Sequence, residues 1–262
     1  MKIAAWQALS TRFDIEDNLT RLDVAARRAV DEGAELLITP EMFLTGYVLG
    51  SRTRELAMQA PLEKARAIAE KNGIGLVVGG AEFENGNCYN AAHLIDEFGQ
   101  VLARYRKTHL FGELDRGQFA AGEKLTAITD YRGVRIALLI CYDVEFPESV
   151  RAAALEGAEL MCVPTAQMAP FAHVNKRLIP TRAWENQVYI VYANQHGSEA
   201  QLDYVGTSII VGPDSETLAE AETVGETLIY ADIHPEVVRK GRENNPYLVD
   251  LRQEMFSRSH QD

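Results

Sequence analysis

The order of the apolar, strand-like runs is the feature that most constrains the fold of this chain. Some runs are separated by helical patterns, whereas those in 74–107 and 188–233 follow one another directly. Directly joined strands form antiparallel hairpins, and strands joined by helices form parallel pairs. The mixture favours layered α/β sheets over a strictly alternating doubly wound fold. The expected strands cover 2–8, 35–39, 74–83, 91–96, 100–107, 134–141, 159–165, 188–195, 206–213 and 227–233, and the expected helices cover 17–32, 61–72, 147–156 and 171–187.

The composition fits one large domain spanning residues 1–262, because 47% of the residues are hydrophobic and no low-complexity linker interrupts them. A formal net charge of -12 argues against binding to nucleic acid or to anionic membranes. No apolar stretch approaches the roughly 20 residues that cross a bilayer, and the N-terminus lacks a secretory pattern. We therefore expect a cytoplasmic protein with reduced cysteines, in which Cys88 and Cys162 are core thiols. Singly scattered histidines and the absence of CxxC and HExxH motifs predict no metal site.

Two nine-residue segments, GAELLITPE (33–41) and GAELMCVPT (157–165), match in register, and each follows an amphipathic helical pattern. The glycine suits a helix C-cap, and the apolar run after it suits a buried strand. The proline comes where each strand should end, so the next residue lies at the carboxyl edge of a sheet, where ligands usually bind in α/β proteins. Glu41 takes this position in the first copy, and Cys141 takes the equivalent position after another apolar run.

Glu41, Lys107 and Cys141 each stand at the end of a strand-like run. Singly, each has a structural explanation, because strand-end charges are commonly solvated and a buried cysteine commonly acts as a small hydrophobe. Together they have the composition of a catalytic set. A thiol with a pKa of about 8.5 is only a few per cent ionised near neutrality, and a nearby cation and carboxylate can promote its attack. His109 leaves a Cys–His hydrolase as an alternative, although no third group to orient the imidazole is evident.

Three blocks, LLITPEMFLTGY, RYRKTHLF and LLICYDVEFPE, resemble the motifs of the nitrilase superfamily of carbon–nitrogen hydrolases and occur in that family's order. The flanking segments KIAAWQA, TRAWENQVYIVYANQ and GTSIIVGP extend the likeness over nearly the whole chain. The resemblance implies an α/β fold, a four-layer α-β-β-α sandwich of two mixed sheets. It also implies a homodimer or higher homo-oligomer that stacks through helical faces.

The same resemblance implies the roles of the site residues. Cys141 is the nucleophile, Glu41 the general base, and Lys107 the cation that stabilises the oxyanion, with the backbone N–H of Tyr142 as a second oxyanion donor. An amide would be hydrolysed through an acyl-thioester with release of ammonia, and no cofactor is needed.

Substrate-positioning residues are less sharply defined. Family members often carry a further glutamate after the lysine, for which Glu113 is the best match and Glu123 the fallback. The other pocket candidates are Tyr47, Phe146, Thr165, Gln167, Met168 and Phe171, and the residues expected to support the site from behind are Arg182, Glu185 and Asn186.

The substrate is indicated by the segments around the cysteine. CYDVEFPE, followed by ELMCVPTAQM, resembles the amidase branch that acts on small aliphatic amides, including ω-amino amides such as 5-aminopentanamide. Nitrilases more often have a tryptophan directly after the cysteine, whereas this chain has Tyr142, which favours an amide over a nitrile. N-carbamoyl amidohydrolases share the same machinery and remain an alternative. An inactive scaffold is disfavoured because Glu41, Lys107 and Cys141 are all present.

Overall fold

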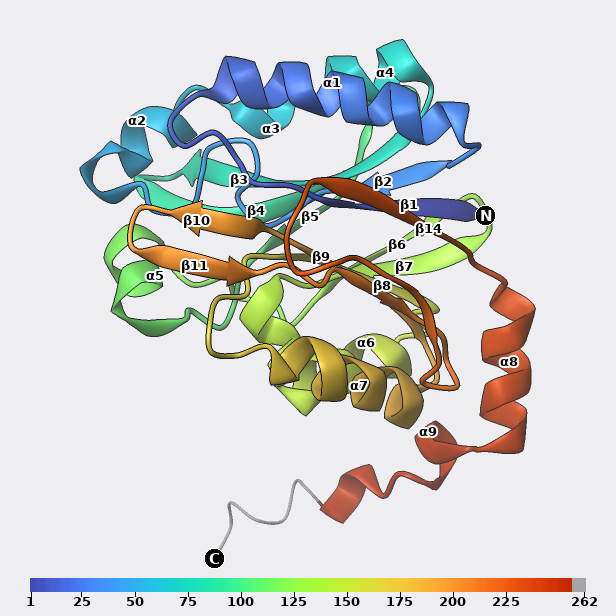
Figure 1. Ribbon diagram of the computed structural model, residues 1–262. Helices are drawn as coiled ribbons and strands as arrows, with labels where there is room; N and C mark the ends of the chain where they lie inside the picture. Colours follow the sequence, from blue (N-terminus) through green and yellow to red (C-terminus); the bar gives the residue numbers. More distant parts are fainter. Residues whose placement is uncertain (256–262) are drawn as a thin grey trace, which may run out of the picture.

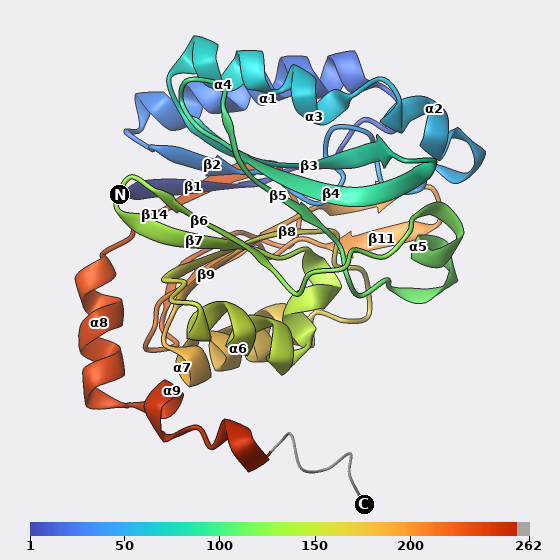
Figure 2. The same cartoon turned by 180° about the vertical axis from the view of Figure 1, so that it is seen from behind.

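Two six-stranded mixed sheets form the centre of the protein in a computed structural model that describes residues 1–255. The first sheet has the order β14-β1-β2-β3-β4-β5 and the second β13-β12-β9-β8-β7-β6, while β10 and β11 form a separate hairpin. Helices α1, α3 and α4 cover the outer face of the first sheet, and α6 and α7 cover that of the second (Figures 1 and 2). The predicted four-layer α-β-β-α arrangement is confirmed.

The strands of the first sheet are β1 (Lys2–Gln7), β2 (Leu36–Ile38), β3 (Gly75–Glu84), β4 (Asn87–Ile95), β5 (Val101–Arg106) and β14 (Thr227–Asp232). Those of the second sheet are β6 (Ala127–Tyr131), β7 (Val134–Leu138), β8 (Leu160–Thr165), β9 (Tyr189–Asn194), β12 (Ile209–Val211) and β13 (Thr217–Glu220). The hairpin consists of β10 (His196–Glu199) and β11 (Leu202–Val205).

The α-helices are α1 (Ile15–Asp31), α2 (Thr53–Ala57), α3 (Pro61–Lys64), α4 (Arg66–Asn72), α5 (Gly112–Gln118), α6 (Pro147–Leu155), α7 (Ile179–Asn186), α8 (Pro235–Asn244) and α9 (Tyr247–Asp250). The short 3₁₀ turns are η1 (Gly50–Arg52), η2 (Cys141–Glu145) and η4 (Gln253–Met255), and η3 (Val174–Leu178) is a π-helical turn. Within residues 1–255, no helix has the length and apolar character that a membrane crossing requires.

Strand β1 illustrates why the central strands read as continuous apolar runs. Ile3 and Ala5 point into the core between the two sheets, whereas Ala4 and Trp6 point into the core beneath α1. Successive side chains alternate between the two faces of a strand, and both faces are covered here. No polar alternation therefore marks these strands in the sequence.

The two copies of the GAEL segment form equivalent parts of the two sheets. Strand β2 lies between β1 and β3, and β8 lies between β7 and β9, all in parallel pairs. The C-caps of α1 and α6 are Glu32 and Glu156, and Gly33 and Gly157 follow them with φ angles of +79° and +91°, the left-handed conformation that commonly ends a helix. The carboxyl ends of the two copies meet, because the Glu41 N–H donates to the Thr165 carbonyl at 3.2 Å.

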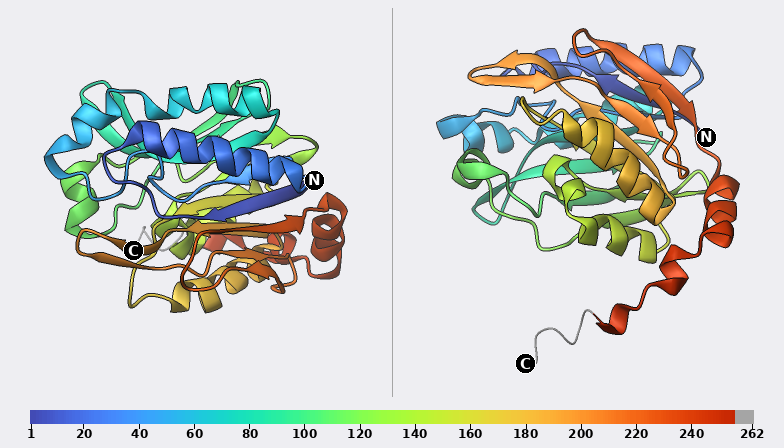
Figure 3. Two further views of the ribbon diagram at one scale, coloured as in Figure 1. Left: turned by 45° about the horizontal axis from the view of Figure 1, so that its top comes forward. Right: turned by 60° about the horizontal axis from the view of Figure 1, so that its bottom comes forward.

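Several boundaries differ from those expected. The helix predicted over 61–72 divides into α3 and α4 at Ala65, and the one predicted over 171–187 begins with the π-helical turn η3 before α7. The sequence patterns did not predict β6, β10, β11, β13, α2, α5, α8 or α9. Figure 3 shows α8 and α9 running from the sheet edge along the side of the sandwich. Helix α9 lies near α7, because the ring centroids of Tyr247 in α9 and Trp184 in α7 are 6.4 Å apart.

Candidate active site

Three strand ends deliver the predicted catalytic residues to one region of the fold. Glu41 follows β2 by three residues, Lys107 directly follows β5, and Cys141 opens the turn η2 after β7. All three side chains are buried. Glu41 and Lys107 are in direct contact, and the charges of both act on the Cys141 thiol.

A buried ion-pair cluster surrounds Lys107. Its Nζ lies 2.7 Å from Glu41 Oε1 and 2.8 Å from Asp115 Oδ2. Burial lowers the pKa of Lys107, but the negative charges of its neighbours, led by Glu41, raise that pKa more, and the net shift is well above the usual range. The ammonium is therefore held in its charged form. Two of its three N–H groups are used by these carboxylates, which leaves one for another acceptor.

The two carboxylate oxygens of Glu41 have different surroundings. Oε1 accepts hydrogen bonds from Lys107 and from the Asn90 side-chain amide at 2.6 Å, whereas buried Oε2 has no hydrogen-bond partner within residues 1–255. Burial raises the pKa of Glu41, and the negative charge of Asp115 raises it further against the attraction of Lys107. Oε2 is consequently a buried acceptor that is available to take a proton.

Cys141 lies at a sharp change of chain direction. Its φ angle is +46°, in the left-handed region that a side chain with a Cβ rarely adopts. The Sγ atom lies 3.7 Å from Gln167 Oε1 and accepts from the backbone N–H of Ala166. Burial and the charge of Glu41 raise the pKa of the thiol well above its usual range, against the attraction of Lys107. The resting group is therefore a thiol, which needs a base when it attacks.

The backbone at the start of η2 offers a further hydrogen-bond donor. The N–H groups in the first turn of a helix have no intrahelical acceptor. Tyr142 N–H is one of these, and nothing in the described part of the chain accepts its hydrogen. It belongs to the peptide directly after the thiol-bearing residue, which makes it a candidate donor to an oxyanion formed by attack of the sulfur.

A cavity of about 260 Å³ opens onto the Cys141 thiol. Four aromatic residues contribute to its walls, together with Glu145, Gln167 and Met168; the aromatic residues are Tyr47, Phe111, Tyr142 and Phe171. A small molecule with a polar reacting group fits such a lining, in which the aromatic side chains can pack against its apolar part.

Comparison with known proteins agrees with this geometry. The family model described as "Carbon-nitrogen hydrolase" matches residues 2–243. The chain belongs to this family. An (R)-stereoselective amidase from Pseudomonas sp. is 34% identical over 96% of this chain and 92% of its own length. A nitrilase from Pyrococcus abyssi is 32% identical over 98% of this chain and the whole of its own length.

Among solved structures, the NitN amidase of Nesterenkonia sp. AN1 superposes with a TM-score of 0.90 at 37% identity, covering 98% of both chains. Variants of that amidase have been solved with acrylamide added to the active-site cysteine and in complex with butyramide. The present chain is thus an amidohydrolase of the nitrilase superfamily with Cys141 as its active-site cysteine.

The carbon–nitrogen hydrolase site does not contain Glu113. This side chain is 96% exposed and pairs with Arg116, so the prediction that it is the further site carboxylate is wrong. Residues two apart on a helix point in nearly opposite directions, and it is Asp115 of α5 that faces inward. Asp115 accepts hydrogen bonds from Tyr47 Oη at 2.6 Å, Lys107 Nζ at 2.8 Å and Phe111 N–H at 2.9 Å.

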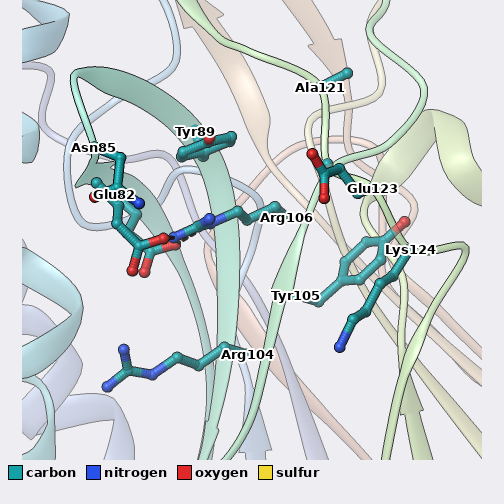
Figure 4. Close-up of a pocket in the computed structure, with 11 residues that line it drawn as sticks. Glu82, Asn85, Tyr89, Arg104, Tyr105, Arg106, Ala121, Glu123 and Lys124 are labelled. Carbon is teal, nitrogen blue, oxygen red and sulfur yellow. Dashed lines mark hydrogen bonds and ion pairs between the residues drawn. The ribbon is translucent and has the colours of Figure 1, made fainter.

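Glu123, the fallback, also lies elsewhere. It belongs to the wall of a separate polar cavity of about 420 Å³ whose lining contains neither Lys107 nor Cys141 (Figure 4). In this wall Arg106 pairs with Glu82 and Glu84 at 2.9 Å each.

Two further pocket candidates lie outside the Cys141 cavity. Thr165 is fully buried, and its hydroxyl donates to the Val163 carbonyl. Phe146 lines a neighbouring hollow and stacks on the His109 ring, with centroids 3.8 Å apart. His109 Nδ1 lies 2.8 Å from Asp143 Oδ1. Among the described residues, the structure gives His109 no contact with the thiol, which leaves the Cys–His alternative without its central contact.

Arg182 supports the catalytic turn from behind. Its Nε and Nη2 atoms donate to the carbonyls of Val144 and Glu145 at 3.1 and 2.7 Å, and its Nη1 pairs with Glu185 at 2.9 Å. These bonds satisfy the carboxyl end of η2, as the sequence predicted for this segment. No cluster of three or more metal-binding side chains occurs in residues 1–255.

Proposed function

We propose that this chain hydrolyses a small aliphatic primary amide to the carboxylic acid and ammonia through an acyl-thioester on Cys141. The observation that carries the proposal is the unpartnered Oε2 of Glu41, a buried acceptor whose other oxygen is fixed by Lys107. A nucleophilic thiol, a free base and a fixed cation are the groups that acyl transfer requires.

In the first step, the thiol proton passes to Glu41 while the sulfur forms a bond to the amide carbonyl carbon. The negative charge that develops on the carbonyl oxygen is stabilised by the remaining N–H of Lys107 and by the backbone N–H of Tyr142. Such preorganised donors commonly contribute about a hundredfold or more each to the rate. When the tetrahedral intermediate collapses, the carbon–nitrogen bond breaks and the protonated Glu41 supplies the proton with which ammonia leaves.

In the second step, water replaces ammonia. Glu41 takes a proton from the water as its oxygen attacks the thioester carbon, and the same two donors stabilise the second oxyanion. The carbon–sulfur bond then breaks, the sulfur recovers the proton from Glu41, and the acid is released. The carboxylate ends each cycle in its starting state, so no cofactor enters the balance.

The size and charge of the cavity support a small amide. The butyramide complex of the Nesterenkonia amidase supports the same class. N-carbamoyl amino acids carry a carboxylate that Glu145 in the cavity wall would repel, whereas N-carbamoyl amines remain an alternative. Tyr142 after the cysteine favours amides over nitriles, although the Pyrococcus relative is named a nitrilase.

Ammonia release from a panel of aliphatic amides, nitriles and N-carbamoyl compounds tests this function. We expect turnover of small amides, no turnover by Cys141→Ala, and full activity in the matched variant Cys88→Ala, whose thiol lies outside the cavity lining. Retention of amide turnover by Cys141→Ala would overturn the mechanism. Faster release from nitriles or N-carbamoyl amines than from any amide would overturn the substrate class.

A further inference from the structure

Glu145 is a carboxylate in the wall of the Cys141 cavity to which the proposed mechanism gives no role. It ends the turn η2 that Cys141 begins, and its side chain is half-buried. The guanidinium of Arg182 binds the main-chain oxygen of Glu145 and directs its Nη1 to Glu185. Glu145 has no ion pair with any residue in the described part of the chain.

The charge of this carboxylate is only partly balanced. Burial raises the pKa of Glu145, while the more distant positive charges of Lys107 and Arg182 and a hydrogen bond from Gln167 lower it. Among residues 1–255, the cavity lining contains no lysine or arginine, and Glu145 is its only acidic residue. A partly desolvated negative charge without its own counter-ion favours the entry of a positive one.

The walls beside this carboxylate suit an organic cation. The ring of Phe111 meets Tyr142 and Phe171 edge-on, with centroids 5.2 and 5.9 Å away. Aromatic rings attract ammonium groups electrostatically and also pack against the methylene groups attached to them. A carboxylate among aromatic side chains is therefore suited to bind an alkylammonium group.

We propose that Glu145 is a specificity-determining residue that binds the ammonium group of an amino amide whose carbonyl carbon lies at Cys141. The inference rests on the proposed function, which supplies the amide reaction. Cys141 and Glu145 are the two ends of a short 3₁₀ turn, about 8 Å apart along its axis at roughly 2 Å per residue. The matching substrate is a short linear amide with a few methylene groups between its carbonyl and its ammonium group.

Glu145 could instead act only by orienting Gln167, which it contacts and which lies 3.7 Å from the thiol. The two roles have different consequences. A residue that only orients Gln167 changes the rate for every amide by the same factor. A residue that binds the ammonium group changes the discrimination between a charged amide and a neutral amide of the same shape.

The test compares 5-aminopentanamide with hexanamide, in which a methyl group replaces the ammonium group. We expect the wild type to prefer the amino amide in kcat/KM, and Glu145→Gln to reduce this preference about tenfold or more, mainly through KM. Glu148→Gln removes the same charge from an exposed position on α6 and should keep the wild-type preference. An unchanged preference in Glu145→Gln, or none in the wild type, would overturn the proposal.

Binding of n-butylammonium, measured by calorimetry, separates this proposal from the amidase function. We expect it to bind wild type and Cys141→Ala alike and to bind Glu145→Gln about tenfold or more weakly. Equal binding to all three proteins would contradict the role of Glu145 whatever the turnover. If neither amide is hydrolysed but this binding pattern holds, the proposed reaction fails and the cation site stands.

Discussion

At the residue scale, the arrangement that governs the chemistry is the buried row Glu41–Lys107–Asp115, in which two carboxylates share one ammonium. Burial raises the pKa of Glu41, and the negative charge of Asp115 raises it further against the attraction of Lys107. Such a base is stronger than a solvated glutamate. Glu41 needs this greater base strength because burial has also raised the pKa of the Cys141 thiol, from which Glu41 takes a proton.

Replacing Asp115 by Asn tests this coupling. Glu41 must be ionised to act, so kcat/KM falls as the pH falls through the pKa of Glu41 in the free enzyme. The charge of Asp115 raises that pKa, so its removal should shift the acid limb of the pH profile to lower pH. Loss of the bond to Lys107 should lower the plateau by roughly ten- to a hundredfold.

Glu113→Gln is the matched control, because it removes a carboxylate two residues away that is exposed to solvent. Its pH profile and plateau should equal those of the wild type. An acid limb that stays in place in Asp115→Asn would contradict the coupling between the two carboxylates.

The sequence identified the strand-end residues of the site but not their supporting shell. Glu41, Lys107 and Cys141 stand in motifs at the ends of apolar runs, and the structure brings them to one place. Asp115 was missed because GELD contains two acids, and only the start of α5 decides which one faces inward. Asn90 could have been noticed from the sequence, since it is a polar residue at the start of a mainly apolar strand segment, NAAHLI.

At the scale of elements, strand β3 supports the loop that carries Glu41. Gly79 accepts a hydrogen bond from Leu44 N–H at 3.1 Å and donates one to Thr39 Oγ1 at 3.2 Å. A Cβ atom at Gly79 would lie 2.7 Å from the Pro40 oxygen and 2.8 Å from the Met42 nitrogen, both backbone atoms. The loop packs so closely on β3 that only glycine fits beneath it.

Gly79→Ala should therefore move the loop and displace Glu41 from Lys107. A displacement of about 1 Å can cost on the order of a hundredfold in rate. The neighbouring Gly80→Ala is the control, because its nearest contact is the side-chain Cβ of Leu44 at 3.3 Å. We expect amide turnover to fall far more in Gly79→Ala than in Gly80→Ala, with thermal melting to verify that both fold. Equal turnover in the two variants would contradict this role of β3.

Long, continuously apolar elements were predictable, whereas short or polar ones were not. Strand β8 and helix α1 were found within two residues of their limits because burial imposes a pattern on each. Helix α8 carries the charged sequence PEVVRKGREN with only Val238 buried, so its pattern is faint. Ala65, which divides α3 from α4, is a good helix former and gives no sign of the break.

At the scale of the whole molecule, the packing of the two sheets assembles the site. Gln195 joins them, since its N–H donates to the Thr165 carbonyl at 3.3 Å and its Nε2 to the Glu41 carbonyl at 3.0 Å. The sequence indicates antiparallel neighbours within 74–107, which the structure shows as β3, β4 and β5, but it does not indicate that β14 pairs with β1. The prediction that the two sheets pack face to face came from the family resemblance, because apolar runs do not specify which sheet surfaces are in contact. The homo-oligomer implied by that resemblance stays a prediction.

The stability of the molecule should depend on pH through His93, a residue of β4 remote from the thiol. The imidazole is buried, neither ring nitrogen has a hydrogen-bond partner within residues 1–255, and Glu82 Oε1 lies 4.0 Å away. Burial lowers its pKa from 6.5 to about 4. The unfolded chain therefore binds a proton near pH 6.5, whereas the folded chain binds it only near pH 4.

Between these values the unfolded state holds more protons, so the free energy of unfolding decreases as the pH falls, by about 3 kcal/mol over the whole window. Urea titrations of wild type and His93→Gln at pH 7.5 and 4.5 measure this term. The variant should lose less stability on acidification, because it lacks the buried imidazole that the unfolded chain protonates more readily than the folded one. His173→Gln, which removes an exposed imidazole, should follow the wild type. Parallel pH dependence of wild type and His93→Gln would mean that the buried ring takes up its proton in the folded state as readily as in the unfolded one.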